Sequence, residues 1–253
     1  MFAPRLALAS LSGEADAEWA RAASEWAGCA FLGGIALDEP TREAAREMVA
    51  DRDRTEFLPA DPLAFVDAQL GALAEVPVRP GYNVRAASPD PIRAAGAVCA
   101  DHDAILEINA HCRQAEMCAA GCGETLLENP DRLREYVAAA AGAGADVSVK
   151  VRAEVEGVSL PALAADIEAA GAAAIHVDAM DSEAVVGEVA DAAPDLFLVA
   201  NNGVRDRATV REYLDHGADA VSVGRPSDDP RVLRRVNEAV LEATAERAKR
   251  ADA

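Results

Sequence analysis

A dense group of polar residues follows a short apolar run near the middle of the chain: Asn109, His111, Cys112 and Arg113. The asparagine amide can donate and accept hydrogen bonds, which suits the edge of a heterocycle. The neighbours His111 and Arg113 would lower the pKa of the Cys112 thiol from its ordinary value of about 8.5. The segment predicts a proton donor or nucleophile near neutral pH, and the alternative is a cysteine packed as a small hydrophobe.

Two cations, Lys150 and Arg152, close another apolar run, and their spacing puts both on one face of a strand. Two positive charges there are costly unless a negative group lies between them. Lysine occurs only at positions 150 and 249, so Lys150 is not ordinary surface filling. Its ammonium is predicted to hold negative charge on an enolate or a reduced flavin ring. The alternative is a rim lysine with its ammonium in solvent.

Two glycine-containing turns follow the last two apolar runs of the chain, Asn201-Asn202-Gly203 and Gly224-Arg225. Glycine lets backbone N–H groups approach phosphate oxygens, and Arg225 can add a charged clamp. Together the turns predict a phosphate site. The alternative is two tight turns beside an exposed arginine.

The elements that position these residues are eight β-type runs alternating with Ala-rich helical stretches. The strands are expected at 5–11, 29–35, 80–86, 104–109, 146–152, 173–178, 195–200 and 219–223. This alternation is typical of βα units and a parallel sheet. Eight units predict an α/β fold of the closed (β/α)8 TIM-barrel type, and the alternative is an open doubly wound sheet. In such a barrel the ends of the strands build the active site.

Capping residues mark several helix boundaries. Starts are predicted at Asp38 with Thr41, at Asn129-Pro130 and at Ser159 with Pro161, and ends at Gly171 and Gly217. Residues 51–62 are expected to form a longer charged connection. Because no linker divides the chain, residues 1–253 are expected to form one barrel domain.

The chain is strongly acidic, with 44 acidic against 24 basic residues and a formal charge of −20. Such a surface repels nucleic-acid phosphates and anionic membranes. With so few lysines, the composition is typical of a salty cytoplasm and predicts a halophilic organism, where salt screens the repulsion. No signal-peptide layout or long apolar run occurs, so we expect a cytoplasmic protein without a membrane partner.

Five cysteines in a chain without a secretory signal predict free thiols. Four of the potential metal ligands lie close together: His111, Cys112, Cys118 and Cys122. Their spacing fits no common zinc pattern, so no metal site is expected.

The strongest motif is Glu107-Ile108-Asn109-Ala110-His111-Cys112 followed by Gly121-Cys122-Gly123-Glu124-Thr125-Leu126-Leu127-Glu128-Asn129-Pro130. It resembles the Asn-x-Gly-Cys-Pro block and downstream Gly-x-Gly, Leu-Leu and Pro of the dihydrouridine synthase family. These FMN-dependent barrels reduce a uracil ring in tRNA and are related to dihydroorotate and dihydropyrimidine dehydrogenases. Within the family the chain is most similar to a short archaeal branch. Lys150-Val151-Arg152, Asn201 with Gly203, and Gly224-Arg225 are similar to its Lys-x-Arg, Asn-Gly turn and phosphate loop.

The resemblance implies an FMN site and a reaction. FMN would be bound by Ser10, Leu11, Asn83, Lys150, Asn201, Gly203, Gly224 and Arg225. Hydride would pass from reduced flavin to a pyrimidine C=C bond, with Cys112 protonating the adjacent carbon and Asn109 holding the ring. The substrate pocket would include Asn109, His111, Arg113, Arg152 and Asp178, and NADPH or NADH would reduce the flavin.

Several residues depart from the family pattern. Arg113 stands at a proline, His111 at a glycine, and Asp178 with Met180 at a His-x-Arg pair. One helix from 230 to about 250 stands in place of a separate C-terminal tRNA-binding domain. The substrate, a free pyrimidine or a uridine within tRNA, is therefore left open, as is the oligomeric state.

Two other functions remain as alternatives. One is a flavin-free phosphate-binding isomerase or lyase that uses Lys150 and Asp178 as acid and base. The other is a flavin-binding protein in which Cys112 does no chemistry. His176, two residues before Asp178, is expected to be a structural histidine.

Overall fold

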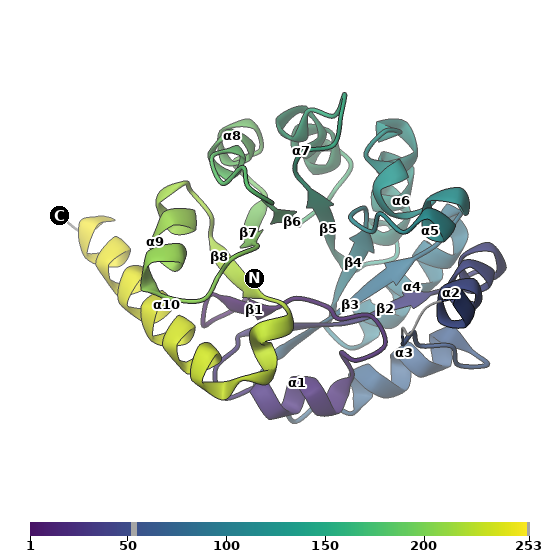
Figure 1. The fold of residues 1–253 in the computed structure, drawn as a ribbon, viewed down its shortest axis with the longest axis horizontal. Helices are drawn as coiled ribbons and strands as arrows, with labels where there is room; N and C mark the ends of the chain where they lie inside the picture. Colours follow the sequence, from purple (N-terminus) through teal and green to yellow (C-terminus); the bar gives the residue numbers. More distant parts are fainter. Residues whose placement is uncertain (52–54, 252–253) are drawn as a thin grey trace.

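The computed structural model describes residues 1–51 and 55–251. Eight parallel strands, paired in chain order, close into a barrel that helices surround (Figure 1). The strands are β1 Leu6–Leu8, β2 Cys29–Ala36, β3 Arg79–Arg85, β4 Ile105–Asn109, β5 Asp146–Arg152, β6 Ala174–Asp178, β7 Phe197–Asn201 and β8 Ala220–Val223. The predicted (β/α)8 barrel is confirmed, and each strand overlaps the run predicted for it.

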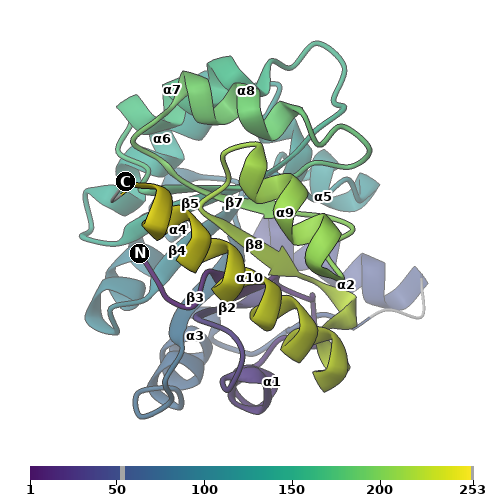
Figure 2. The ribbon, with the colours of Figure 1, turned by 90° about the vertical axis from the view of Figure 1, so that its left-hand side faces the viewer.

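Helices follow the strands along the chain. They are α1 Ala17–Ala23, α2 Glu39–Asp51, α3 Pro62–Gly71, α4 Pro89–Asp101, α5 Ala115–Ala119, α6 Pro130–Ala141, α7 Leu160–Ala169, α8 Val185–Ala192, α9 Arg207–Asp215 and α10 Pro230–Ala251, with the short 3-10 helices η1 Gly123–Leu126 and η2 Arg225–Asp228. Helix α10 crosses the outside of the barrel beside α9 and contacts β1 (Figure 2).

The predicted caps hold the helix ends. The Asp38 carboxylate accepts from the Thr41 N–H at 3.3 Å, Asn129 caps α6 and Ser159 caps α7. Gly171 and Gly217, just past α7 and α9, have φ values of 101° and 102°. A side chain is strained in that region, so these glycines end the helices and turn the chain into the next strand.

Part of the predicted connection at 51–62, residues 52–54, lies outside the described residues. In the described part of this connection, Phe57 forms an isolated parallel bridge with Ile35 of β2. Among the helices of residues 1–51 and 55–251, none is both long and apolar enough to cross a lipid bilayer.

The barrel interior is apolar at the N-terminal ends of the strands and polar toward their C-terminal ends. The apolar layer consists of Phe2, Ala7, Cys29, Phe31, Ile105, Val199 and Ala220. Since side chains alternate along a strand, Ile105 is followed on the inward face of β4 by Glu107 and then Asn109. The strands thus carry polar side chains from the buried interior to the open end of the barrel.

Candidate active site

A cavity of about 600 Å³ opens at the C-terminal ends of the strands. Its volume falls within the roughly 300–1,000 Å³ typical of small-molecule sites. The lining residues are Ser10, Leu11, Ser12, Glu14, Thr55, Arg85, Asn109, His111, Cys112, Arg113, Gln114, Lys150, Arg152, Asp178, Met180 and Arg225. All predicted site residues line this cavity except Asn83, Asn201, Gly203 and Gly224.

The cavity has the opposite charge balance to the rest of the chain. Its lining contains five cations, Arg85, Arg113, Lys150, Arg152 and Arg225, and two carboxylates, Glu14 and Asp178. The whole sequence has 44 acidic and 24 basic residues. Positive groups gathered in a cleft attract an anionic ligand, so the site is built for negative charge.

Lys150 and Arg152 lie side by side on β5 and have different surroundings. The Arg152 guanidinium forms an ion pair with Glu124, Nη1 to Oε2 3.0 Å. Lys150 is 5% exposed, and its ammonium has no hydrogen-bond partner among residues 1–51 and 55–251. Its charge acts on the carboxylates of Glu107 and Asp178 and lowers the pKa of each. Negative groups therefore do accompany the two cations, and one buried ammonium is left to bind a ligand.

The loop after β4 is held so that Cys112 borders the cavity. Asn109 Oδ1 accepts from the backbone N–H of His111 at 3.2 Å and of Cys112 at 2.9 Å. The Cys112 carbonyl accepts from the Glu124 N–H at 2.9 Å. Cys112 thus has its backbone fixed on both sides, is 8% exposed and borders the cavity, and it also packs in a buried apolar cluster with Met48, Met117 and Cys122.

Asn83 lies one layer below the place expected for a flavin ligand. It is fully buried and outside the cavity lining. Its Oδ1 accepts from Asn109 Nδ2 at 2.9 Å, and its Nδ2 donates to Glu107 Oε1 at 2.7 Å. The side chain therefore supports Asn109 from beneath, and the expected direct contact with flavin has no geometric support.

A buried chain of hydrogen bonds continues from Glu107 across the barrel. Glu107 Oε2 lies 2.7 Å from His176 Nδ1, and His176 Nε2 lies 2.7 Å from the Ser222 hydroxyl oxygen. All three side chains are fully buried. His176 is thus the satisfied structural histidine that the sequence predicts, and it joins β4 to β8 through β6.

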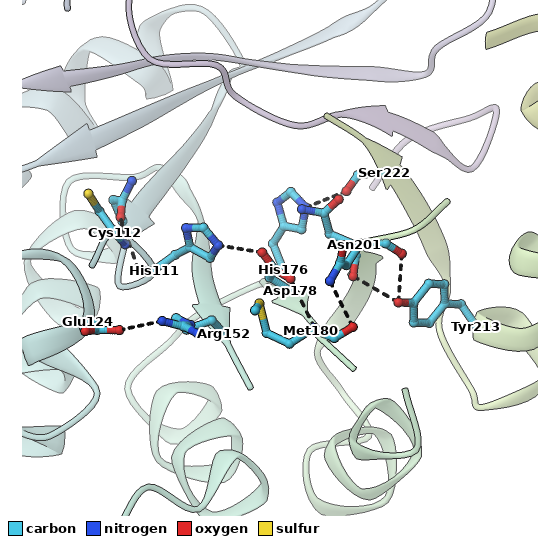
Figure 3. Close-up of polar contacts among 12 residues, drawn as sticks. His111, Cys112, Glu124, Arg152, His176, Asp178, Met180, Asn201, Tyr213 and Ser222 are labelled. Carbon is cyan, nitrogen blue, oxygen red and sulfur yellow. Dashed lines mark hydrogen bonds and ion pairs between the residues drawn. The ribbon is translucent and has the colours of Figure 1, made fainter. Parts of the chain in front are cut away.

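His111 points across the cavity to β6 and forms an ion pair with Asp178. His111 Nε2 lies 2.7 Å from Asp178 Oδ2, and the Met180 N–H donates to Asp178 Oδ1 at 3.2 Å (Figure 3). Burial alone would raise the pKa of Asp178, but these bonds and Lys150 outweigh it and lower that pKa. The His111 ring is directed away from the Cys112 thiol, so the two do not form a thiol–imidazole pair (Figure 3).

The two predicted phosphate turns lie on neighbouring strands, but only Arg225 reaches the cavity lining. The Asn201 carbonyl is occupied by the Ala179 N–H at 3.1 Å and the Tyr213 hydroxyl at 3.2 Å (Figure 3). Gly203 has a φ of 64° and is exposed. An added Cβ at Gly224 would meet no atom within 4 Å, so its backbone is open to a ligand. The turns flank Arg225 at one side of the cavity.

Arg85 is a lining residue that the sequence predictions missed. Its Nη1 lies 2.8 Å from Glu56 Oε2, both side chains are nearly fully buried, and Nη2 donates to the Ser12 hydroxyl. Glu124, the partner of Arg152, was also missed as a site residue. A signal for Arg85 did exist, because it stands two residues after Asn83 and therefore on the same inward face of β3.

Three of the four clustered metal-ligand candidates have separate partners. His111 binds Asp178, the Cys118 thiol lies 3.7 Å from the Cys112 carbonyl, and the Cys122 thiol donates to the Met117 carbonyl at 3.2 Å. Burial raises the pKa of Cys122 to about 12. In the part of the chain that the structure describes, no group of three or more His, Cys, Asp or Glu residues could hold a metal ion.

The same barrel occurs in solved structures. DHODH from Eimeria tenella in complex with ferulenol superposes with a TM-score of 0.69 at 17% identity, covering 96% of this chain and 82% of that one. Its ligand-free form gives 0.68 at 14% identity, with 94% and 84% covered. 3-Hexulose-6-phosphate synthase gives 0.55 at 14% identity, with 93% and 99% covered. At these identities the likeness shows a common fold.

Comparison of sequences identifies the protein family, which the fold alone does not. An uncharacterized protein of Methanocaldococcus jannaschii is 28% identical over 135 residues, which are 53% of this chain and 52% of that protein. The chain thus spans about half the length of this curated relative. Residues 83–252, from β3 to the end of α10, match the family described as dihydrouridine synthase (Dus). Since this match takes in most of the cavity lining and well over half of the chain, the protein belongs to the dihydrouridine synthase family.

Proposed function

We propose that the protein reduces the C=C bond of a pyrimidine, with Cys112 as the proton donor. The observation that carries this proposal is that Cys112 borders the same cavity as Lys150, whose ammonium has no hydrogen-bond partner among residues 1–51 and 55–251. A proton donor and a binder of negative charge are the two protein groups that a flavin-dependent reduction of a double bond needs.

The residues of the cavity fit FMN. Lys150 offers a buried ammonium without a hydrogen-bond partner in the described part of the chain, and Arg225 adds a cation beside the open backbone of Gly224. Ser10 and Leu11 border the cavity from the loop after β1. Lys150 would hold the ring and Arg225 the phosphate, as the excess of positive charge in the lining supports.

The chain's own groups have separate tasks in this reaction. Bound FMN supplies the hydride. Cys112 holds a proton on its sulfur and gives it to the substrate carbon next to the one that receives the hydride, leaving a thiolate that solvent reprotonates. Asn109 fixes the loop through Oδ1, and its second Nδ2 hydrogen is left for the substrate ring.

The substrate pocket is proposed at His111, Arg113, Arg152 and Asp178. Arg113 is exposed at the mouth of the cavity, where it can meet a phosphate, while the His111–Asp178 pair presents both a donor and an acceptor. These groups suit either a uridine within tRNA or a free pyrimidine. NADPH or NADH is the proposed electron donor, in a cytoplasm of high salt.

The test begins with the purified protein. We expect it to be yellow and to oxidise NADPH or NADH with tRNA, uracil or orotate as the alternative electron acceptors. A colourless protein that takes up no FMN contradicts the proposal. Turnover with only one of the three partners identifies the substrate class.

The proton-donor role is tested with Cys112→Ala. The variant should lose roughly 100- to 10,000-fold in pyrimidine reduction, the usual contribution of a general acid, while flavin reduction by NADPH or NADH stays normal. Cys118→Ala is the matched control, because Cys118 lies nearby in α5 but outside the cavity lining, and it should retain activity. Unchanged reduction by Cys112→Ala refutes the role and leaves a flavin-binding protein without cysteine chemistry.

A further inference from the structure

The polar layer beneath the cavity contains a carboxylate that the proposed reaction does not use. Glu107 is fully buried. Its Oε1 accepts from Asn83 Nδ2 at 2.7 Å, and its Oε2 lies 2.7 Å from His176 Nδ1. Burial alone would raise the pKa of Glu107, but His176, Lys150 and Asn83 outweigh it and hold that pKa below its ordinary value. Glu107 is therefore an ionised group inside the barrel.

The proton positions on His176 follow from this charge. A carboxylate can only accept, so His176 must donate from Nδ1. Burial lowers the pKa of His176 in spite of Glu107, which makes the imidazole neutral. A neutral ring that donates from Nδ1 accepts at Nε2, so the Ser222 hydroxyl donates there. His176 orients the carboxylate and leaves its charge unbalanced.

Lys150 is a buried cation on the neighbouring strand whose charge acts on Glu107, although less strongly than His176 does. Lys150 lies on β5, which pairs with β4. Glu107 on β4 is the register partner of Ser148 on β5, and Lys150 follows Ser148 by two positions. Its charge lowers the pKa of Glu107, and its ammonium has no hydrogen-bond partner among the described residues. The group expected to hold negative charge in the cavity thus has a fixed negative charge one layer below it.

We propose that Glu107 is a positioning residue that tunes the charge Lys150 presents to the cavity and so sets the reduction potential of the bound flavin. This rests on the FMN site proposed above. Reduction adds negative charge to a flavin, which a cation stabilises. A fixed anion beneath Lys150 offsets part of that stabilisation, so it lowers the potential and makes the reduced flavin a stronger hydride donor.

Glu107→Gln tests the charge while keeping the hydrogen bonds. The new amide can accept from Asn83 with its oxygen and donate to His176 Nδ1, provided His176 shifts its proton to Nε2 and donates to Ser222. The midpoint potential of bound FMN should rise relative to wild type. Ser148→Ala is the matched control: Ser148 lies at the same depth, and its buried hydroxyl has no partner within the described residues. The midpoint potential of FMN bound to the Ser148→Ala protein should equal that of FMN bound to wild type.

The outcomes separate this inference from the proposed function. Wild-type protein that binds no FMN overturns both. Wild-type and Glu107→Gln proteins that bind FMN with equal potentials overturn the role of Glu107 alone.

A second measurement does not depend on the variant folding. Nitrogen-15 NMR of the FMN-loaded wild-type protein should show His176 neutral and protonated at Nδ1 near neutral pH. An imidazolium signal for His176 overturns the inference, because the ring would then balance the charge of Glu107.

Discussion

The His111–Asp178 ion pair makes a pH-dependent contribution to stability. The folded-state pKa of Asp178 lies below its ordinary value, so between that pKa and the unfolded value of about 3.9 the unfolded chain binds more protons. The contribution of the ionised, hydrogen-bonded Asp178 carboxylate is therefore present above about pH 4 and is lost as the pH falls through its folded pKa.

Asp178→Asn should lower the free energy of unfolding by about 1 kcal/mol near pH 6, the usual value of one hydrogen bond. Urea unfolding of both proteins down to about pH 3 should show this difference shrinking as Asp178 of the wild type takes up its proton. Glu107 titrates in both proteins, so the difference isolates Asp178. A difference that stays constant over this range contradicts the assignment.

The location of single residues at the cavity was predictable where the residue type was unusual for its place in the sequence. Lys150 in a chain almost without lysine, and Cys112 within a polar segment after a strand, both border the cavity. Partners far apart in sequence were not predictable. Asp178 is 67 positions from His111, and only the closure of the barrel brings them to 2.7 Å. Asn83 was placed one layer too high, because sequence shows which face of a strand a residue occupies but not its depth.

The loop after β4 and the helix η1 are locked together by Gly123. This residue has a φ of 68°, and an added Cβ would lie 2.1 Å from the Cys112 carbonyl oxygen. No side chain fits there unless the loop that carries the thiol moves.

Gly123→Ala should lower the free energy of unfolding by about 2 kcal/mol, within the range for a strained backbone. It should also slow pyrimidine reduction by roughly 100-fold, the effect of misplacing a catalytic group by about 1 Å. Gly157→Ala is the matched control. Its φ is also positive, at 77°, but an added Cβ meets nothing within 4 Å, so stability should fall while the rate is kept. Equal rates in the two variants would show that Gly123 does not position Cys112.

The elements themselves were largely predictable, because alternating apolar runs and capping residues are local signals. All eight strands and the caps at Asp38, Asn129 and Ser159 lie where the sequence places them. The short helices η1 and η2 were not predicted as helices. Each has only four residues, too few for helical periodicity to show in the sequence. They pack against neighbouring helices, η1 against α5 and α6 and η2 against α10.

At the scale of the whole molecule, charge is divided between the cavity and the rest of the chain. The formal charge is −20, yet the cavity lining holds an excess of cations. An anionic ligand is drawn to the cavity and repelled by the surrounding surface. Salt screens such a long-range repulsion more than it weakens contacts inside the site.

The same imbalance predicts that salt stabilises the fold. Surface ion pairs such as Arg207–Glu242 and Arg211–Glu246 join α9 to α10, but exposed pairs contribute only about 0–1 kcal/mol each. With 44 acidic and 24 basic residues, repulsion between like charges outweighs them and destabilises the compact state. Screening should therefore raise the melting temperature, by about 2–4 °C for each kcal/mol of repulsion removed.

The shape of the salt dependence separates screening from general salting-out. The Debye length falls from about 10 Å at 0.1 M to about 3 Å at 1 M, so screening is nearly complete by then. Thermal unfolding in KCl should show most of the gain in melting temperature below about 1 M. A melting temperature that falls over this interval, or rises only at higher concentrations, would mean that repulsion among the acidic residues does not limit stability.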